Sequence, residues 1–137
     1  PDLYAAGINY VGVVNIENLI PKAVAPSRMH WMHTRIGDLS NAEDRKRIYE
    51  TSPVHFADRI RVPVLMAYGR NDPRVTIDQG YDIERALKRN NRPYQFIVEK
   101  EEGHGFRDET KRIAFYTEID AFLKRHIPAA PAAGAAN

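Results

Sequence analysis

A short apolar run, Val64 to Tyr68, limits what this chain can fold into more than any other stretch of its sequence. An uncharged run of this length is typical of a strand that is buried on both faces of a parallel sheet. The run ends at Gly69, and Asp72-Pro73 follows, a pair typical of a turn. Ligands of open α/β sheets bind at the carboxyl ends of the strands. The sequence therefore predicts a carboxylate, that of Asp72, at the ligand-binding edge of a sheet.

Two further stretches are predicted to be strands. The stretch from Ala5 to Val14 is small, β-branched and uncharged, which suits a strand covered on both faces. Tyr94, Phe96 and Val98 recur at every second position, the period of a strand. Helical patterns separate the strands, so the order is strand, irregular excursion with helices, strand, helix, strand, helix. This alternation predicts an α/β fold with three mostly parallel strands and helices on both faces of the sheet.

Helix starts are predicted from residues that cap helix N-termini. Ser40 and Thr76 each stand three residues before a Glu or a Gln, the spacing of a capping box. Ser52 precedes Pro53, which fits the first position of a helix. Asp108 can cap the last helix.

Other segments are predicted from their apolar and charged residues. The irregular excursion, residues 15–35, ends in a short helix that holds Met29, Trp31 and Met32. The mixed charges of residues 99–102 indicate a solvated strand exit. In the last helix one apolar stripe is expected to face the core. Its members are Ile113, Tyr116, Ile119, Leu123 and Ile127. The aromatic residues Phe115, Tyr116 and Phe122 of the same helix are also expected in the core.

Three strands make a narrow sheet, and the chain has few elements with which to cover both faces of its first strand. We therefore expect residues 1–127 to form the C-terminal part of a larger domain, with Pro1 an internal start. Residues 128–137 are rich in Ala and Pro and are expected to be disordered. Because unpaired sheet edges pair with other chains, self-association through such an edge is expected of the isolated chain.

Charge and cysteine content argue against several classes of protein. The 137 residues include 20 Lys and Arg and 18 Asp and Glu, a formal charge of +2 with the signs interspersed, which argues against a nucleic-acid partner. No apolar run reaches the roughly 20 residues of a membrane helix, so we expect a water-soluble chain without a membrane partner. The absence of cysteine excludes disulfides and thiolate metal sites. The compartment, cytoplasmic, periplasmic or secreted, stays open.

Histidine is the other residue type that commonly binds metals. His30 and His33 lie three residues apart, a spacing that metals can use, but no third ligand is evident in the sequence. We expect neither a metal nor another cofactor.

A histidine follows the last predicted strand, as Asp72 follows the central one. His104 comes 32 residues after Asp72, between two glycines. Both are expected at the same sheet edge, because the carboxyl ends of parallel strands meet there. A carboxylate beside an imidazole fixes the tautomer of the ring and stabilises the imidazolium that forms when the ring takes a proton from a nucleophile. Acid before histidine is also the order in α/β-hydrolases, whose nucleophile lies upstream on a Gly-x-Ser-x-Gly turn.

No nucleophile of that kind is visible in this sequence. None of the serines, Ser27, Ser40 and Ser52, lies in a Gly-x-Ser-x-Gly context. Two of them are better explained as helix caps, and Ser27 as a loop hydroxyl. The chain therefore offers two of the three partners of a catalytic triad.

A set of motifs occurs in order along the chain. They are Arg35-Ile36-Gly37-Asp38, Ser52-Pro53, Ile60-Arg61-Val62-Pro63-Val64-Leu65, Gly69-Arg70-Asn71-Asp72-Pro73-Arg74-Val75 and Gly103-His104-Gly105-Phe106. In this order they resemble the prolyl oligopeptidase family of serine peptidases, and in particular the C-terminal half of its α/β-hydrolase catalytic domain. The resemblance runs from about Asp2 to Ile127 and implies an enzyme that cleaves peptides through an acyl-enzyme.

The resemblance implies roles for four residues. Asp72 would be the acid of the triad, and His104 the general base that later protonates the leaving amine. Arg74 matches a residue that contacts a substrate backbone carbonyl, which suits its permanent, directional charge. Val75 matches a residue that lines the pocket for the residue before the scissile bond.

The resemblance also implies parts that this chain does not contain. It places the nucleophilic serine shortly before Pro1, and a β-propeller or similar N-terminal domain further upstream. The expected partners are thus a peptide substrate, the remainder of the catalytic domain and that N-terminal domain, and the chain alone is expected to be inactive. The segment that matches part of the substrate pocket has the aliphatic Ile16 and Leu19, where aromatic residues are frequent, so residue preference stays open. Two alternatives also stay open, a carboxylesterase-type α/β-hydrolase and a non-catalytic interaction module with this fold.

Overall fold

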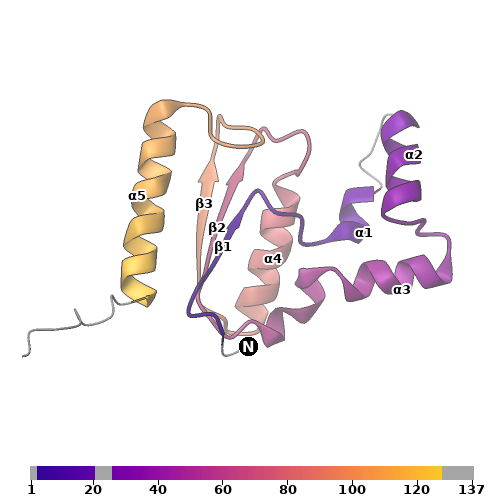
Figure 1. Ribbon diagram of the computed structural model, residues 1–137, viewed down its shortest axis with the longest axis horizontal. Coiled ribbons are helices and arrows are strands. Elements are labelled where there is room, and N and C mark those ends of the chain that lie inside the picture. Colours follow the sequence, from indigo (N-terminus) through magenta and orange to yellow (C-terminus); the bar gives the residue numbers. More distant parts are fainter. Residues whose placement is uncertain (1–2, 21–25, 128–137) are drawn as a thin grey trace, which may run out of the picture.

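Three parallel strands form the sheet of this protein, in the order β1-β2-β3 (Figure 1). The computed structural model describes residues 3–20 and 26–127. The strands are β1 (Gly7–Tyr10), β2 (Val64–Gly69) and β3 (Tyr94–Glu99), and both pairings are parallel. The expected α/β fold with three parallel strands is therefore confirmed. The first strand is shorter than expected because it ends at Tyr10, where Val11 takes a positive φ of 46°.

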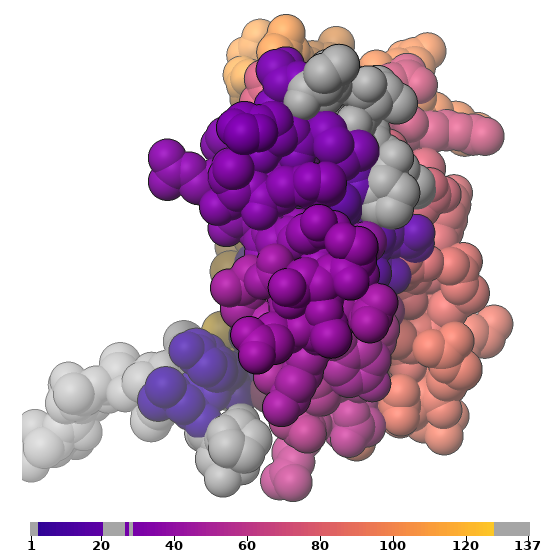
Figure 2. Space-filling model, turned by 90° about the vertical axis from the view of Figure 1, so that its right-hand side faces the viewer, coloured from indigo at the N-terminus to yellow at the C-terminus, as the bar shows by residue number. Residues whose placement is uncertain are grey.

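Helices cover both faces of the sheet, with α5 on one face and α4 on the other (Figure 1). The helices are α1 (Ile16–Leu19), α2 (Pro26–Arg35), α3 (Ala42–Glu50), the 3₁₀-helix η2 (Pro53–Arg59), α4 (Asp78–Arg89) and α5 (Glu109–His126). Helices α1 to α3 lie beyond α4, and α2 and α3 form much of the surface in Figure 2. The short helix expected around Met29 to Met32 is α2, whereas the single turn of α1 was not expected.

The central strand separates two apolar cores. Its side chains alternate between the faces of the sheet, and Leu65, Met66, Ala67 and Tyr68 are all fully buried. Leu65 and Ala67 pack on the α5 side, with Phe106, Phe115 and Phe122. Met66 and Tyr68 pack on the α4 side, with Val14, Ala57, Val75, Ile83, Ala86 and Leu87. Burial on both faces explains why the sequence of β2 shows no polar alternation.

The starts of α3 and η2 differ from their sequence prediction. Helix α3 is capped by Asn41 and not by Ser40, because the Asn41 side-chain oxygen accepts from the N–H groups of Glu43 and Asp44, at 2.9 and 3.1 Å. Ser52 stands before η2 but makes no capping hydrogen bond. Its buried hydroxyl instead donates to the carbonyl of Ile48, at 2.7 Å, and accepts from the N–H of Ile16, at 3.1 Å. Ser52 therefore joins the end of α3 to the start of α1.

The last helix begins where predicted but buries a different face. The Asp108 side chain caps it by accepting from the N–H of Lys111, at 2.9 Å. The predicted stripe is wrong in part, because Ile113, Tyr116 and Ile127 are exposed. The buried face is set by the aromatic residues Phe115 and Phe122, about two helical turns apart, with Ile119 and Leu123 partly buried beside them.

Strand β1 lies at one edge of the sheet. Among the described residues, β1 has a hydrogen-bonded neighbour on one side only, which is β2. The expected disorder of residues 128–137 falls outside the described residues. In the described part of the chain, no helix is both long and apolar enough to cross a membrane.

The buried Tyr68 is expected to make the protein less stable in alkali. Its hydroxyl donates to the carbonyl of Gly12, at 2.8 Å, and accepts from the Asn9 amide, at 3.0 Å, and burial raises the pKa of Tyr68 from 10.0 to about 12. As pH rises through this interval, Tyr68 ionises in the unfolded chain while it stays protonated in the folded one. The free energy of unfolding should therefore fall by about 1.4 kcal/mol per pH unit from this residue.

Urea unfolding of wild type and Tyr68→Phe between pH 8 and pH 12 measures this effect. The phenylalanine variant should start about 1 kcal/mol less stable, through the lost hydrogen bond. It should then lose less stability than wild type as the pH rises from 10 to about 12. Equal slopes in the two proteins over this interval would contradict the assignment.

Candidate active site

The loop that follows β2, residues 70–77, holds Asp72 in a fixed orientation and is called the acid loop below. Asp72 Oδ1 accepts hydrogen bonds from the N–H groups of Arg74, at 2.7 Å, and Val75, at 3.0 Å. The Asp72 side chain is completely shielded from solvent. One carboxylate oxygen thus orders the turn in which the residue sits, and the other oxygen, Oδ2, is left to bind a second group.

That second group is the ring of His104. Its Nδ1 lies 2.8 Å from Asp72 Oδ2, and 36% of the side chain is exposed. The loop after β2 and the loop after β3 thus bring together the two residues that the sequence places at this edge. A carboxylate accepts only, so Nδ1 carries the proton of a neutral His104 and Nε2 is the nitrogen that can take one up.

The close contact between the loops after β2 and β3 is possible because Gly69 has no side chain. A Cβ atom at this position would lie 2.3 Å from the carbonyl oxygen of Gly103 and 2.4 Å from that of Glu102. Backbone hydrogen bonds then join the loops, from Arg70 N–H to the Glu99 carbonyl, at 2.8 Å, and from Asn71 N–H to the Glu102 carbonyl, at 3.0 Å. The acid loop therefore lies directly against the backbone that leads into His104.

Glu102 stabilises the loop that follows β3 and carries His104, residues 100–108. Its side chain is buried, and its carboxylate accepts from the N–H groups of Arg107, at 2.8 Å, and Asp108, at 3.2 Å. The prediction of a solvated strand exit is therefore wrong for this residue. It holds for the neighbouring Glu101, whose exposed carboxylate pairs with Lys111 at 2.8 Å. That hydrogen bond lowers the pKa of Glu101 and raises the pKa of Lys111.

Tyr10 supports the same loop from β1. Its hydroxyl oxygen accepts from the N–H of Phe106, and its ring packs against Phe106 and Phe115, with centroid distances of 5.2 and 4.7 Å. Burial raises the pKa of Tyr10. Sequence reasoning gave this residue no role beyond the strand, because a contact between residues so far apart in sequence leaves no local pattern.

An apolar hollow of about 420 Å³ lies on one side of His104. Arg74 and Val75 line it, as do Ile16 and Leu19 of α1. Its remaining lining residues are Val13, Trp31, Met32 and Ile36. Sequence reasoning placed Arg74, Val75, Ile16 and Leu19 at a pocket through the family resemblance, but it missed the contribution of α2.

A second, polar hollow of about 500 Å³ lies beside His104. It is lined by Pro73, Arg74, Glu101, Glu102, Gly103 and Arg107. Arg74, like His104, therefore lines both hollows, and a guanidinium there can bind an acceptor on a ligand.

No serine is among the residues that line either hollow in the described part of the chain. Ser52, the buried serine, is hydrogen-bonded to Ile48 and Ile16. In the same described residues, no three acidic or histidine side chains gather where they could hold a metal ion. The site therefore consists of an acid–histidine pair beside an apolar hollow.

Comparison with known families shows to which proteins this chain is related. The Prolyl oligopeptidase family profile matches residues 1–129. The chain belongs to the prolyl oligopeptidase family. The prediction of this family, and of part of an α/β-hydrolase fold, is confirmed.

Individual members of the prolyl oligopeptidase family resemble the chain over most of its length. Dipeptidyl aminopeptidase BIII of Pseudoxanthomonas mexicana is 33% identical over 126 residues, which are 90% of this chain and 18% of the relative. The acylamino-acid-releasing enzyme of Rattus norvegicus is 25% identical over 133 residues, 93% of this chain and 18% of the relative. The structure of a puromycin-hydrolyzing peptidase of Mycobacterium tuberculosis matches with a TM-score of 0.79 and 28% identity, over 92% of this chain and 19% of that one. The chain thus spans about a fifth of the length of these relatives.

Proposed function

We propose that this chain supplies the acid and the histidine of a serine peptidase that cleaves peptides through an acyl-enzyme. The observation that carries the proposal is the hydrogen bond between Asp72 Oδ2 and His104 Nδ1, 2.8 Å long, next to an apolar hollow. His104 Nε2 takes the proton of the nucleophile, and Asp72 stabilises the imidazolium that results. The same nitrogen then donates this proton to the leaving amine.

The nucleophile in this proposal is a serine from the part of the catalytic domain that precedes Pro1. The loop that carries it also supplies the N–H group that follows the nucleophile, which normally completes the oxyanion hole. The chain alone is therefore expected to be inactive. Assay of the chain with peptide p-nitroanilides and p-nitrophenyl esters tests this, and turnover that is abolished by His104→Ala would contradict it.

The proposed substrates are short peptides. The apolar hollow would bind the side chain of the residue before the scissile bond, with Val75 as part of its wall. Arg74, which lines both hollows, would donate to a substrate backbone carbonyl. Relatives named as a dipeptidyl aminopeptidase and an acylamino-acid-releasing enzyme support a peptide over a small ester.

A fluorophosphonate probe on the complete protein tests the proposal. Such a probe reacts with a serine that an adjacent histidine activates. We expect one labelled serine upstream of Pro1 and no labelling in His104→Ala. The enzyme that has not been treated with the probe should hydrolyse peptides. If the serine is labelled and the enzyme hydrolyses esters but not peptides, a carboxylesterase is favoured. If no serine is labelled, a non-catalytic module is favoured.

A further inference from the structure

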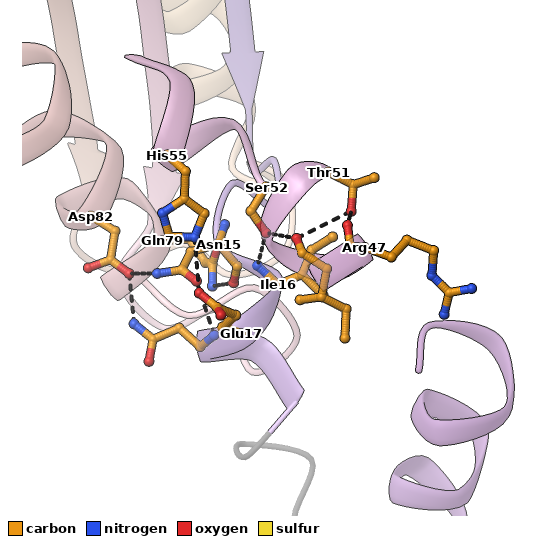
Figure 3. Close-up of polar contacts among 11 residues, drawn as sticks. Asn15, Ile16, Glu17, Arg47, Thr51, Ser52, His55, Gln79 and Asp82 are labelled. Atoms are coloured by element: carbon orange, nitrogen blue, oxygen red, sulfur yellow. Dashed lines mark hydrogen bonds and ion pairs between the residues drawn. The ribbon is translucent and has the colours of Figure 1, made fainter. Parts of the chain in front are cut away.

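A buried glutamine ties α4 to the segment before α1 (Figure 3). Gln79 is completely buried in the first turn of α4. Its Oε1 accepts from the N–H groups of Val14, at 2.9 Å, and Asn15, at 2.7 Å, while its Nε2 donates to the Asn15 carbonyl, at 2.8 Å. The prediction that Gln79 belongs to a capping box with Thr76 is therefore wrong, since its side chain serves a distant segment.

Asp82 continues this tie about one helical turn further along α4. Its Oδ2 accepts from the side-chain amides of Asn15, at 2.8 Å, and Asn18, at 2.7 Å. On the other side of the segment, Ser52 accepts from the N–H of Ile16. Polar side chains thus hold residues 14–18 from two directions, through the backbone at residues 14–16 and through the side chains of Asn15 and Asn18 (Figure 3).

This segment needs such support. Helix α1 comprises only Ile16–Leu19, and a helix of one turn is unstable without tertiary contacts. An apolar side chain in place of Gln79 could fill the same volume, but it would leave the buried N–H of Val14 without a partner. The glutamine therefore fixes where this backbone lies as well as filling space.

The tie joins two walls of the apolar hollow. Ile16 of the tied segment lines it, as do the adjacent Val13 and Leu19. So do Arg74 and Val75, which come just before α4. One continuous stretch, Asp72 to Asp82, thus carries the candidate acid, one wall of the hollow, and the groups that hold the other wall.

We propose that Gln79 is a positioning residue that sets the width of the substrate pocket. Through the backbone of Val14 and Asn15 it fixes Ile16 and Leu19 relative to Val75, and so determines how well a large apolar side chain fits. Asp82 supports the same segment from the next turn, through the side chains of Asn15 and Asn18. The proposal rests on the proposed function for its substrates, but not for the tie itself.

Kinetics of the complete enzyme test the effect on the pocket. The variants are Gln79→Met, which removes all three hydrogen bonds, and the milder Asp82→Asn. Glu84→Gln is the matched control, because Glu84 lies on the same helix but bonds to the Tyr94 hydroxyl, at 3.2 Å. Each is assayed on two peptide p-nitroanilides that differ in Phe or Ala before the scissile bond.

We expect KM for the Phe substrate to rise about tenfold in Gln79→Met and less in Asp82→Asn. KM for the Ala substrate should change by less than about twofold, and kcat and its pH profile should stay as in wild type. The control should match wild type on both substrates. An equal loss on both substrates, or a fall in kcat with a shifted pH profile, would overturn the proposal, since Gln79 would then act on the fold or on the acid–histidine pair.

Amide hydrogen exchange on the complete protein tests the tie without a measurement of activity. The Val14 and Asn15 amides should exchange at least about tenfold faster in Gln79→Met, whereas amides of β2 should be unchanged. Unchanged exchange at Val14 and Asn15 would overturn the proposal, as would equal acceleration in Glu84→Gln. If the complete protein cleaves neither peptides nor esters, the proposed function fails, and the exchange experiment still decides whether Gln79 holds the segment.

Discussion

Replacement of Asp72 by Asn is expected to lower kcat/KM of the complete enzyme by about 10⁴-fold while the fold is retained. Asp72 Oδ1 accepts from the N–H groups of Arg74 and Val75, and the amide oxygen of Asp72→Asn can keep this position. The amide NH₂ group then faces His104 Nδ1, which has to become an acceptor. The ring proton moves to Nε2, and His104 can no longer take a proton from a nucleophile. The loop stays ordered while its base is lost.

Asp78→Asn is a suitable control for this experiment. Asp78 is an exposed acid at the first residue of α4, close to Asp72 in sequence. Hydrolysis of a peptide p-nitroanilide and the rate of fluorophosphonate labelling measure both variants. The control should stay within about twofold of wild type. A loss below about tenfold in Asp72→Asn, or equal losses in the two proteins, would contradict the role of Asp72 as the orienting acid.

The features that the sequence predicted well are those that local pattern determines. Strand β2 is evident because burial on both faces excludes polar residues from Leu65 to Tyr68. Asp72 and His104 could be paired because parallel strands end at one edge, so position along the chain predicts proximity in space. Helix α5 could be started correctly because its cap, Asp108, acts on a residue three positions away.

The features that the sequence did not predict depend on contacts between distant segments. Gln79 has the spacing of a capping residue, and local pattern cannot tell whether its amide turns to its own helix or to Asn15. Glu102 looks like its exposed neighbour Glu101 until the chain turns back and offers it two N–H groups. In α5, the sequence predicted both an apolar stripe and aromatic core residues, and local pattern could not tell that the stripe residues Ile113, Tyr116 and Ile127 are exposed. Phe115 is buried, as predicted, and its ring packs against those of Tyr10 and Phe106.

Gly69→Ala is expected to destabilise the protein by about 3 kcal/mol and to slow active-site labelling by about 100-fold. The added Cβ would lie 2.3 Å from the Gly103 carbonyl oxygen and 2.7 Å from the Glu102 carbonyl carbon. Both are backbone atoms, so no side-chain rotation relieves the contact. The two loops have to separate, and His104, which directly follows Gly103, moves away from Asp72. A shift of about 1 Å in such a pair is enough for a loss of this size.

Gly7→Ala provides the matched control, because a Cβ there would meet only Val64 Cγ2, at an ordinary 3.8 Å. It should change the free energy of unfolding by less than about 1 kcal/mol and leave labelling unaffected. Urea unfolding and fluorophosphonate labelling of both variants give the two readouts. If Gly69→Ala equals Gly7→Ala in both, the loops do not make the close contact that brings the acid to the histidine. If Gly69→Ala loses stability but labels at the wild-type rate, the contact serves the fold, and the Asp72–His104 pair is held by other groups.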